Sequence, residues 1–309
     1  MFVKSFLTGK RGEGRNSIED SISVDISNGR FAVSDGVSKS FLPHVWSSIL
    51  TQAWITVDKI DNFPQEDLGE IFRQERDRIL EVLDEDTRMD YEDLETKYKT
   101  ASATFCGIEH HKGVLKWAII GDSCLFIMPD GEYPLCISSH SMPTDNEGHI
   151  TPYFDNTPFQ VFANGKVYGE WIRGERDFEK GTLLLMSDAM SAWFINTHND
   201  GHNPLEQLMA LTDDESFEQW VDEQCRLGLL NSDDESVVIV QLEEVKQNEQ
   251  TSLNDTLSED NSKEQTKETK ESSAPKKRHG LRIAAFLRLC RIRCRNRQNK
   301  QNGSELQTE

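Results

Sequence analysis

Short apolar segments that end on acidic residues are the feature that most constrains how this chain can fold. Three of them are followed closely by an aspartate: Phe31–Val33 by Asp35, Trp117–Ile120 by Asp122, and Thr182–Met186 by Asp188. Two more have acidic residues just before them, with Glu19-Asp20 before Ser21 and Asp233-Asp234 before Val237. One Asp beside a turn needs no ligand, because Asp is a common turn residue. Five such positions predict carboxylates gathered at the strand ends of a sheet.

The apolar segments are rich in Val, Ile, Leu and Phe, which predicts β-strands. The predicted strands cover residues 21–26, 30–34, 103–108, 114–120, 124–128, 182–186 and 237–242. Apolar residues at helical spacing predict helices over 43–57 and 67–83, with later helices over 204–211 and 216–227. Ser216 and Gln219 have the spacing of a capping box at the start of the last helix. Strands separated by only one helical block indicate a single α+β domain, large enough to be a catalytic domain.

The charge is divided unevenly along the 309 residues. From Ser273 onward there are ten Lys or Arg against two acidic residues, which leaves 24 basic and 52 acidic residues in the first 272. Such an acidic body repels nucleic acid phosphates and attracts divalent cations or basic partners. We expect a catalytic domain over residues 1–242 and a disordered polar linker over 243–279, where large apolar residues are almost absent.

Residues 280–309 form a basic tail in which Phe and Leu alternate with arginines. Three interpretations compete with a solvated, unstructured end. The tail binds an anionic membrane surface, it docks on an acidic partner or on the protein's own acidic body, or it contacts nucleic acid, which is the least favoured. We expect a cytoplasmic protein, peripheral at the membrane if residues 280–297 bind lipid. The six cysteines show no close pairing in the body, which fits a reducing compartment.

Carboxylates brought together at one end of a sheet would repel one another unless cations neutralised them. Oxygen-rich sites suit hard ions such as Mg²⁺ or Mn²⁺, and no His/Cys set has zinc spacing. Two such ions can activate a water and stabilise an in-line phosphoryl displacement. A phosphate would also need a fixed cation, and Arg15, four residues before Glu19, is the candidate anchor. Without the rest of the pattern, Arg15 is better explained as one of the solvated charges of its loop.

Six motifs in order resemble the metal-dependent Ser/Thr protein phosphatases of the 2C type, in their compact bacterial form. They are R-x-x-x-E-D (15–20), F-A-V-S-D-G (31–36), A-S-A-T (101–104), G-D-S (121–123), L-L-M-S-D (184–188) and D-D-x-S before V-V-I-V (233–240). Each motif is weak, but six in order at compatible spacing are a strong signal. The resemblance covers residues 5–242 and implies a β-sandwich of two mainly antiparallel sheets flanked by helical layers.

The resemblance also implies roles for the acidic residues. Asp35 would bridge two metals, the Gly36 carbonyl would ligate one of them, and Asp188 and Asp233 would complete the shell of the other. Glu19 and Asp20 would ligate directly or through water, and Asp122 would help hold a third, weaker ion. Arg15 would bind the phosphate. The implied reaction is hydrolysis of phosphoserine or phosphothreonine in proteins by a water that bridges two Mn²⁺ or Mg²⁺ ions.

Three positions depart from the family pattern. Ala189 replaces the usual glycine after Asp188, and Asp234 replaces the common asparagine. Val37 stands where some members have a histidine that acts as general acid, which leaves the proton donor open between a metal-coordinated water and His44. The polar segment 138–170 corresponds to a mobile flap in the family, and an ordinary surface loop is equally compatible with its sequence.

Two other functions remain open at this point. A pseudophosphatase would keep the sandwich and bind phosphoproteins or a kinase without turnover, and a hydrolase of small phosphate esters would use the same metals. Survival of Asp35, Asp188 and Asp233 favours the active enzyme. Its expected partners are a phosphoprotein substrate and a cognate Ser/Thr kinase in a signalling pathway.

Overall fold

A computed structural model describes residues 1–12, 17–130, 134–139, 142–146, 149–154 and 157–243. The predicted linker beyond its first residue, Glu243, and the basic tail lie outside these residues, as does Arg15. The described residues belong to one unit, Met1–Glu243. None of its helices is long and apolar enough to cross a membrane, within the residues that the structure describes.

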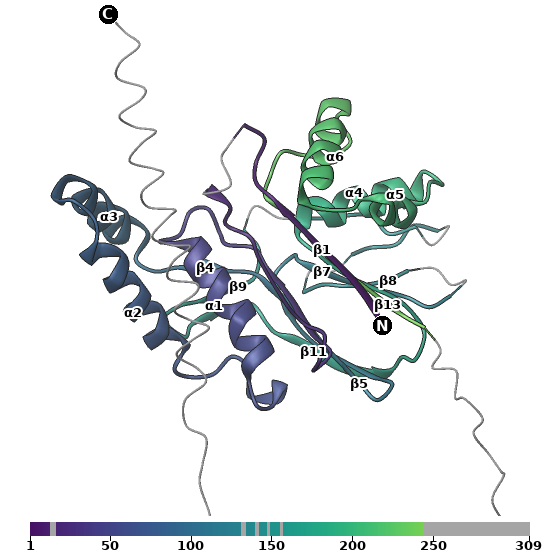
Figure 1. Cartoon of the computed structure of the whole chain (residues 1–309), viewed down its shortest axis with the longest axis horizontal. Helices are drawn as coiled ribbons and strands as arrows, with labels where there is room; N and C mark the ends of the chain where they lie inside the picture. The colour runs from purple at the N-terminus through teal and green to yellow at the C-terminus, as the bar shows by residue number, and fades with distance from the viewer. Residues whose placement is uncertain (13–16, 131–133, 140–141, 147–148, 155–156, 244–309) are drawn as a thin grey trace, which may run out of the picture. The chain divides into compact units, whose positions relative to one another are not determined.

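Two five-stranded antiparallel sheets form the centre of the domain (Figure 1). The first has the order β1-β13-β12-β7-β8, with bounds Phe2–Thr8, Glu235–Leu242, Gly181–Met186, Cys124–Met128 and Leu135–Ile137. The second has the order β11-β6-β5-β3-β2, with bounds Ile172–Asp177, Val114–Ile120, Phe105–His111, Arg30–Ser34 and Ser21–Asp25. A small third sheet joins β10 (Val167–Tyr168), β9 (Gln160–Phe162) and β4 (Ser102–Ala103).

Alternation along the strands explains why their sequences are apolar throughout. In β12, Leu183 and Leu185 pack into the core between the two sheets, whereas Leu184 and Met186 face the core beneath the helices that cover the other face of this sheet. Successive strand residues point to opposite faces, so a strand covered on both sides is apolar at every position. The sandwich with helical layers that the sequence predicted is confirmed.

Helices cover the outer faces of both sheets (Figure 1). On one side lie α4 (Asp188–Asn199), α5 (Pro204–Ala210) and α6 (Asp214–Leu227). On the other, α1 (Pro43–Thr56) packs on β2 and β3, with the short helix η2 (Ile60–Asn62), α2 (Leu68–Glu81) and α3 (Glu85–Tyr98) following it. Bulky side chains of α1, such as Trp54 at 0% exposure, fill the space beneath this layer.

The predicted capping box at Ser216 is wrong in its position. Asp213 is the N-cap of α6, because its side chain accepts a hydrogen bond from the Ser216 backbone while the Ser216 hydroxyl is bonded back to the cap. Helix α6 therefore begins at Asp214, two residues earlier than predicted. The acidic Asp213 side chain at the helix N-terminus satisfies free N–H groups there.

Candidate functional site

The turn after β3 is held close to the segment that enters β2. An ideal Cβ at Gly36 would lie 2.8 Å from the Glu19 backbone oxygen and 2.8 Å from the Pro43 carbonyl carbon. Real Cβ atoms do not approach so closely, so glycine is required for these backbones to meet. As a result, Asp35 and Glu19, which are distant in sequence, lie at the same end of the sandwich.

Asp20 is a buried carboxylate that faces Asp35. The Ser236 hydroxyl donates to its Oδ2 at 2.6 Å, and the two carboxyl groups are in hydrogen-bond contact. Burial raises the pKa of Asp20 well above its ordinary value, and the charges of Asp35 and Asp234 raise it further. A proton or a cation is needed to hold this pair of carboxyls together.

Asp122 reaches the same place from the turn between β6 and β7. Gly121 has φ 97°, and an ideal Cβ there would lie 2.5 Å from Thr104 Cβ, so this turn packs directly on Thr104. The hydroxyls of Thr104 and Ser123 are 2.8 Å apart, and the Thr104 N–H donates to the Asp35 carbonyl at 2.9 Å. The A-S-A-T and G-D-S motifs therefore meet beside Asp35.

Asp188 is the first residue of α4, directly after the buried strand β12. The Ala189 N–H donates to its Oδ1 at 2.6 Å. Burial and the nearby charge of Asp233 raise the pKa of Asp188 to about 6, although the bond from Ala189 opposes this. Ala189 lies in a helical turn, where alanine is the most favoured residue, so the loss of the usual glycine leaves the position of Asp188 intact.

Asp35 is the electrostatic centre of the group. Burial raises its pKa well above the ordinary value, and the charges of Asp188, Asp122 and Asp233 add to the effect in that order. Carboxyls from four separate strand ends therefore act on one another in the folded protein. The sequence prediction that these acidic residues gather at one end of the sandwich agrees with this geometry, while their metal-binding roles stay a prediction.

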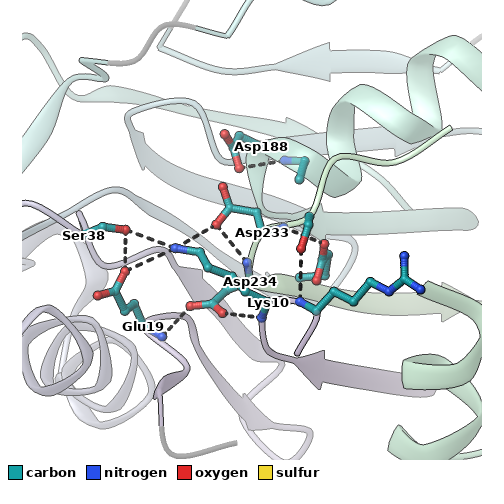
Figure 2. Close-up of polar contacts among 10 residues, drawn as sticks. Lys10, Glu19, Ser38, Asp188, Asp233 and Asp234 are labelled. Atoms are coloured by element: carbon teal, nitrogen blue, oxygen red, sulfur yellow. Dashed lines mark hydrogen bonds and ion pairs between the residues drawn. The ribbon is translucent and has the colours of Figure 1, made fainter. Parts of the chain in front are cut away.

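Asp234 is a site residue that the sequence places among the acidic strand ends, beside Asp233, without indicating a role for it. Its Oδ1 accepts from the Lys10 N–H at 3.0 Å and its Oδ2 accepts from the Glu19 N–H at 2.6 Å. Both oxygens of the buried carboxylate thus hold two loops beside the candidate centre (Figure 2). The loop contacts are distant in sequence, and no local pattern indicates them.

Glu235 is a further buried acidic residue that was not predicted. Its Oε1 accepts from the Asp233 N–H at 3.2 Å, and burial, with the charges of Asp233 and Asp234, raises its pKa to about 9. The alternation of β13 offered a signal, because Glu235 shares its face with the buried Val237 and Ile239.

Lys10 places a positive charge in the middle of these acids, and nothing in its sequence pattern indicated this. Its Nζ lies 3.2 Å from Asp233 Oδ1 and 3.6 Å from Glu19 Oε2, and it donates to Ser38 Oγ at 3.2 Å (Figure 2). Ser38 in turn donates to Glu19 Oε2 at 2.5 Å. Burial opposes the charge of Lys10, but Asp233, Glu19 and Asp234 keep its pKa above the ordinary value.

The residues present fit hard divalent cations. Within the described ranges, three buried carboxyl oxygens have no hydrogen-bond partner: Asp20 Oδ1, Asp122 Oδ1 and Glu235 Oε2. An unpartnered buried oxygen is costly, and an oxygen-only donor set suits Mg²⁺ or Mn²⁺. Among these same described residues, no three His, Cys, Asp or Glu side chains are already arranged to hold one ion, so metal binding would require them to move together.

The structure says less about the remaining positions that the sequence singled out, which are Arg15, Val37, His44 and the flap segment 138–170. Arg15 lies outside the described residues, so its role as a phosphate anchor stays a prediction. Val37 donates its N–H to the Ser102 carbonyl at 3.0 Å and has no proton to offer from its side chain. His44 is the second residue of α1, one position after the Pro43 that packs against Gly36. Part of the predicted flap pairs as strands β9 and β10, and β9 also pairs with β4 beside this turn.

The architecture defines a fold class seen in solved bacterial phosphatases. Stp1 from Staphylococcus aureus, a serine/threonine phosphatase, superposes with a TM-score of 0.50 at 16% identity, over 78% of this chain and 95% of that one. This likeness establishes the fold. The phosphatase PstP/Ppp of Mycobacterium tuberculosis is similar at a TM-score of 0.47 and 22% identity, covering 79% of this chain and 100% of that one.

The PstP catalytic domain has also been solved in complex with two manganese ions, with a TM-score of 0.46, 21% identity, and coverage of 77% of this chain and 97% of that one. No protein-family model matches the sequence, and a search of curated proteins finds no match. The similarity is therefore carried by the fold and by short motifs.

Proposed function

We propose that this protein is a metal-dependent protein-serine/threonine phosphatase that uses Mn²⁺ or Mg²⁺. The observation that carries the proposal is the convergence of Asp20, Asp35, Asp122, Asp188 and Asp233 at one end of the sandwich. Asp20, Asp35, Asp122 and Asp188 have raised pKa values, and Asp20 and Asp122 each have a buried oxygen without a partner, which is the electrostatic state that cations relieve. The fold supports the reaction class, since Stp1 with the same fold is a serine/threonine phosphatase.

Each acidic residue has a separate part in the proposal. Asp35 would be shared between two ions, Asp188 and Asp233 would hold one of them, and Glu19 with the Gly36 carbonyl would hold the other. Asp20 is oriented by Ser236, and Asp122 by the turn that packs on Thr104. Bound divalent ions would activate the attacking water and neutralise charge on the phosphoryl group. A third ion near Asp122 is part of the same proposal.

The chain's own residues would bind and orient the substrate. Arg15 is the proposed anchor for the phosphate, because a guanidinium can bind two phosphate oxygens at once. Val37 cannot protonate the leaving alcohol, so His44 or a water is the proposed donor. The cognate kinase, the cytoplasmic location and the contacts of residues 280–297 stay predictions.

The direct test is phosphate release from a phosphothreonine peptide by the full chain, with EDTA, Mg²⁺ or Mn²⁺. We expect release that depends on the ion and falls at least 100-fold in Asp35→Asn and Asp188→Asn, while circular dichroism stays unchanged. Asp130→Asn is the matched control, because Asp130 pairs only with Lys180 at the surface among the contacts described. Full activity in both site variants would refute the assignment. No release from wild type on a panel of phosphopeptides would favour the pseudophosphatase.

A further inference from the structure

The backbone of Lys10 is fixed at the edge of the candidate centre. Lys10 follows β1 after Gly9, where an ideal Cβ would lie 2.9 Å from Ile18 Cγ1, so the chain packs tightly at this point. The Lys10 N–H donates to Asp234 Oδ1 at 3.0 Å. With its backbone held on Asp234, the side chain extends among the carboxylates and not into solvent (Figure 2).

The ammonium of Lys10 contacts three oxygens. They belong to Asp233, Glu19 and Ser38, at 3.2, 3.6 and 3.2 Å respectively. The lysine side chain is 27% exposed and the Glu19 side chain 22%, whereas the Asp233 side chain is 47% exposed. The pair of Lys10 with Glu19 therefore interacts more strongly than an ordinary surface ion pair, because less water screens it.

The two acids that Lys10 contacts are proposed ligands of different ions. Glu19 and Asp233 lie on separate loops, and the ammonium joins them. The charge of Lys10 also acts on Asp188 and Asp234. Within the residues that the structure describes, Asp20, Asp35 and Asp122 have no described contact with a lysine or arginine side chain. The cation supplied by the chain therefore neutralises one side of the site and leaves the other side to be neutralised from solution.

We propose that the Lys10 ammonium is a tethered cation that supplies, beside Glu19 and Asp233, positive charge that the pair of divalent ions supplies when bound. The centre then binds its ions unequally. A first ion binds through carboxylates that Lys10 does not contact, and the pair of ions is completed only when Lys10 is displaced from Glu19 and Asp233. This inference rests on the proposed function in one respect, that the carboxylates take up divalent ions.

Manganese titration of the metal-free full chain, followed by calorimetry and by electron paramagnetic resonance of free Mn²⁺, tests the proposal. In wild type we expect a strong and a weak class of Mn²⁺ sites. In Lys10→Met, the Mn²⁺ affinity of the weak class should rise at least tenfold, while that of the strong class should change less than threefold. Lys10→Arg, which keeps the charge, should resemble wild type. Lys116→Met is the control, because Lys116 forms an exposed pair with Glu175 at 3.4 Å.

An experiment on the unaltered chain guards against misfolding of the variants. Lysine acetylation read by mass spectrometry should show Lys10 labelled at least threefold faster when Mn²⁺ fills the weak class, with Lys116 unchanged. Equal Mn²⁺ binding by wild type and Lys10→Met, or Lys10 labelling that does not respond to Mn²⁺, would overturn the role of Lys10 alone. Absence of Mn²⁺ binding in both proteins would overturn the metal centre, and the inference with it.

Discussion

At the scale of the residue, the candidate centre depends on close approaches that single side chains decide. The lack of a side chain at Gly36 lets the Glu19 backbone approach, and the same holds for Gly121 and Thr104. Asp234 joins two loops with its two oxygens. None of these groups needs to touch a substrate. Each holds a loop that carries acidic residues of the candidate centre, so substitution should change the position of these acids as well as stability.

Gly36→Ala should separate the turn after β3 from the segment before β2. The added methyl would lie 2.8 Å from the Glu19 oxygen, and the backbones must move to accept it. We expect a loss of about 1–3 kcal/mol in the free energy of unfolding, as for other overpacked sites. Metal-dependent activity should fall at least tenfold in protein that remains folded at the assay temperature. Unchanged urea midpoint and activity would show that the close approach is not required.

Asp234→Ala should destabilise the protein more than Asp234→Asn. The aspartate accepts two backbone N–H groups, and each hydrogen bond to a charged acceptor contributes about 1.5–3 kcal/mol. Alanine removes both acceptors, whereas asparagine keeps one oxygen. We expect losses of about 3 kcal/mol and about 1 kcal/mol respectively from urea unfolding. Equal losses in the two variants would mean that the two loops are held by other contacts.

At the scale of the element, the two helices after α1 differ in what they bury. Helix α2 buries Leu68, Phe72 and Ile79, but α3 has no buried residue. Phe72 packs edge-on against Trp46 of α1 with ring centroids 6.0 Å apart. Helix α2 is therefore part of the core, whereas α3 is held by its N-cap Asp84, by the surface pair of Glu95 with Arg76, and by the edge contact of Tyr91 with Phe41.

Substitutions in α2 and in α3 should differ clearly in their effect on the free energy of unfolding. Phe72→Ala should lower the free energy of unfolding by about 3–5 kcal/mol, because it leaves a cavity beside Trp46. Leu94→Ala on α3 should change it by less than about 0.5 kcal/mol, since Leu94 is 42% exposed. Thermal unfolding of both variants checks this contrast. A loss in Leu94→Ala as large as that in Phe72→Ala would mean that the surface of α3 is covered in solution.

Sequence reasoning recovered the strands that are buried on both faces and missed the polar ones. Val114–Ile120 and Cys124–Met128 were predicted with their observed bounds, since a strand within two apolar layers has an unmistakable composition. Strands β1 and β11 were missed because they carry alternating or charged residues. Helices α3 and α4 were also missed, the first because it lacks an apolar face.

The sequence predicted those site residues that belong to a repeated pattern, an aspartate that follows an apolar strand. Asp35, Asp122 and Asp188 each follow an apolar strand, and this repetition is visible without a structure. Lys10 and Asp234 could not be assigned, because their roles come from contacts between loops more than 200 residues apart. Long-range pairing of polar side chains has no periodic signal in a single sequence.

At the scale of the whole molecule, the acids at one end of the sandwich make stability depend on pH. Burial raises the pKa of Glu235 to about 9 and, together with Asp233, that of Asp188 to about 6. A carboxyl with a raised folded pKa binds more protons in the folded state than in the unfolded state. Its unfavourable contribution therefore begins above the unfolded pKa and grows until the pH reaches the folded pKa.

The metal-free protein should lose stability as the pH rises from about 5 to about 9, where the higher of these pKa values lies. Glu235→Gln should reduce this loss of stability by about 2–3 kcal/mol at pH 8, because it removes the larger of the two pKa shifts. Urea unfolding in EDTA across this pH range measures both effects. Stability that increases toward pH 9 in EDTA would contradict the assigned electrostatics.

The measurement that tests the central claim most directly is anomalous diffraction at the manganese edge from crystals of the full chain grown with Mn²⁺. The account predicts manganese peaks within coordination distance of the Asp35 carboxylate, with Asp188 among the ligands, and displacement of Lys10 wherever a peak lies between Glu19 and Asp233. Carboxylates that remain free of manganese in crystals soaked to saturation, or manganese bound only elsewhere on the acidic surface, would contradict it.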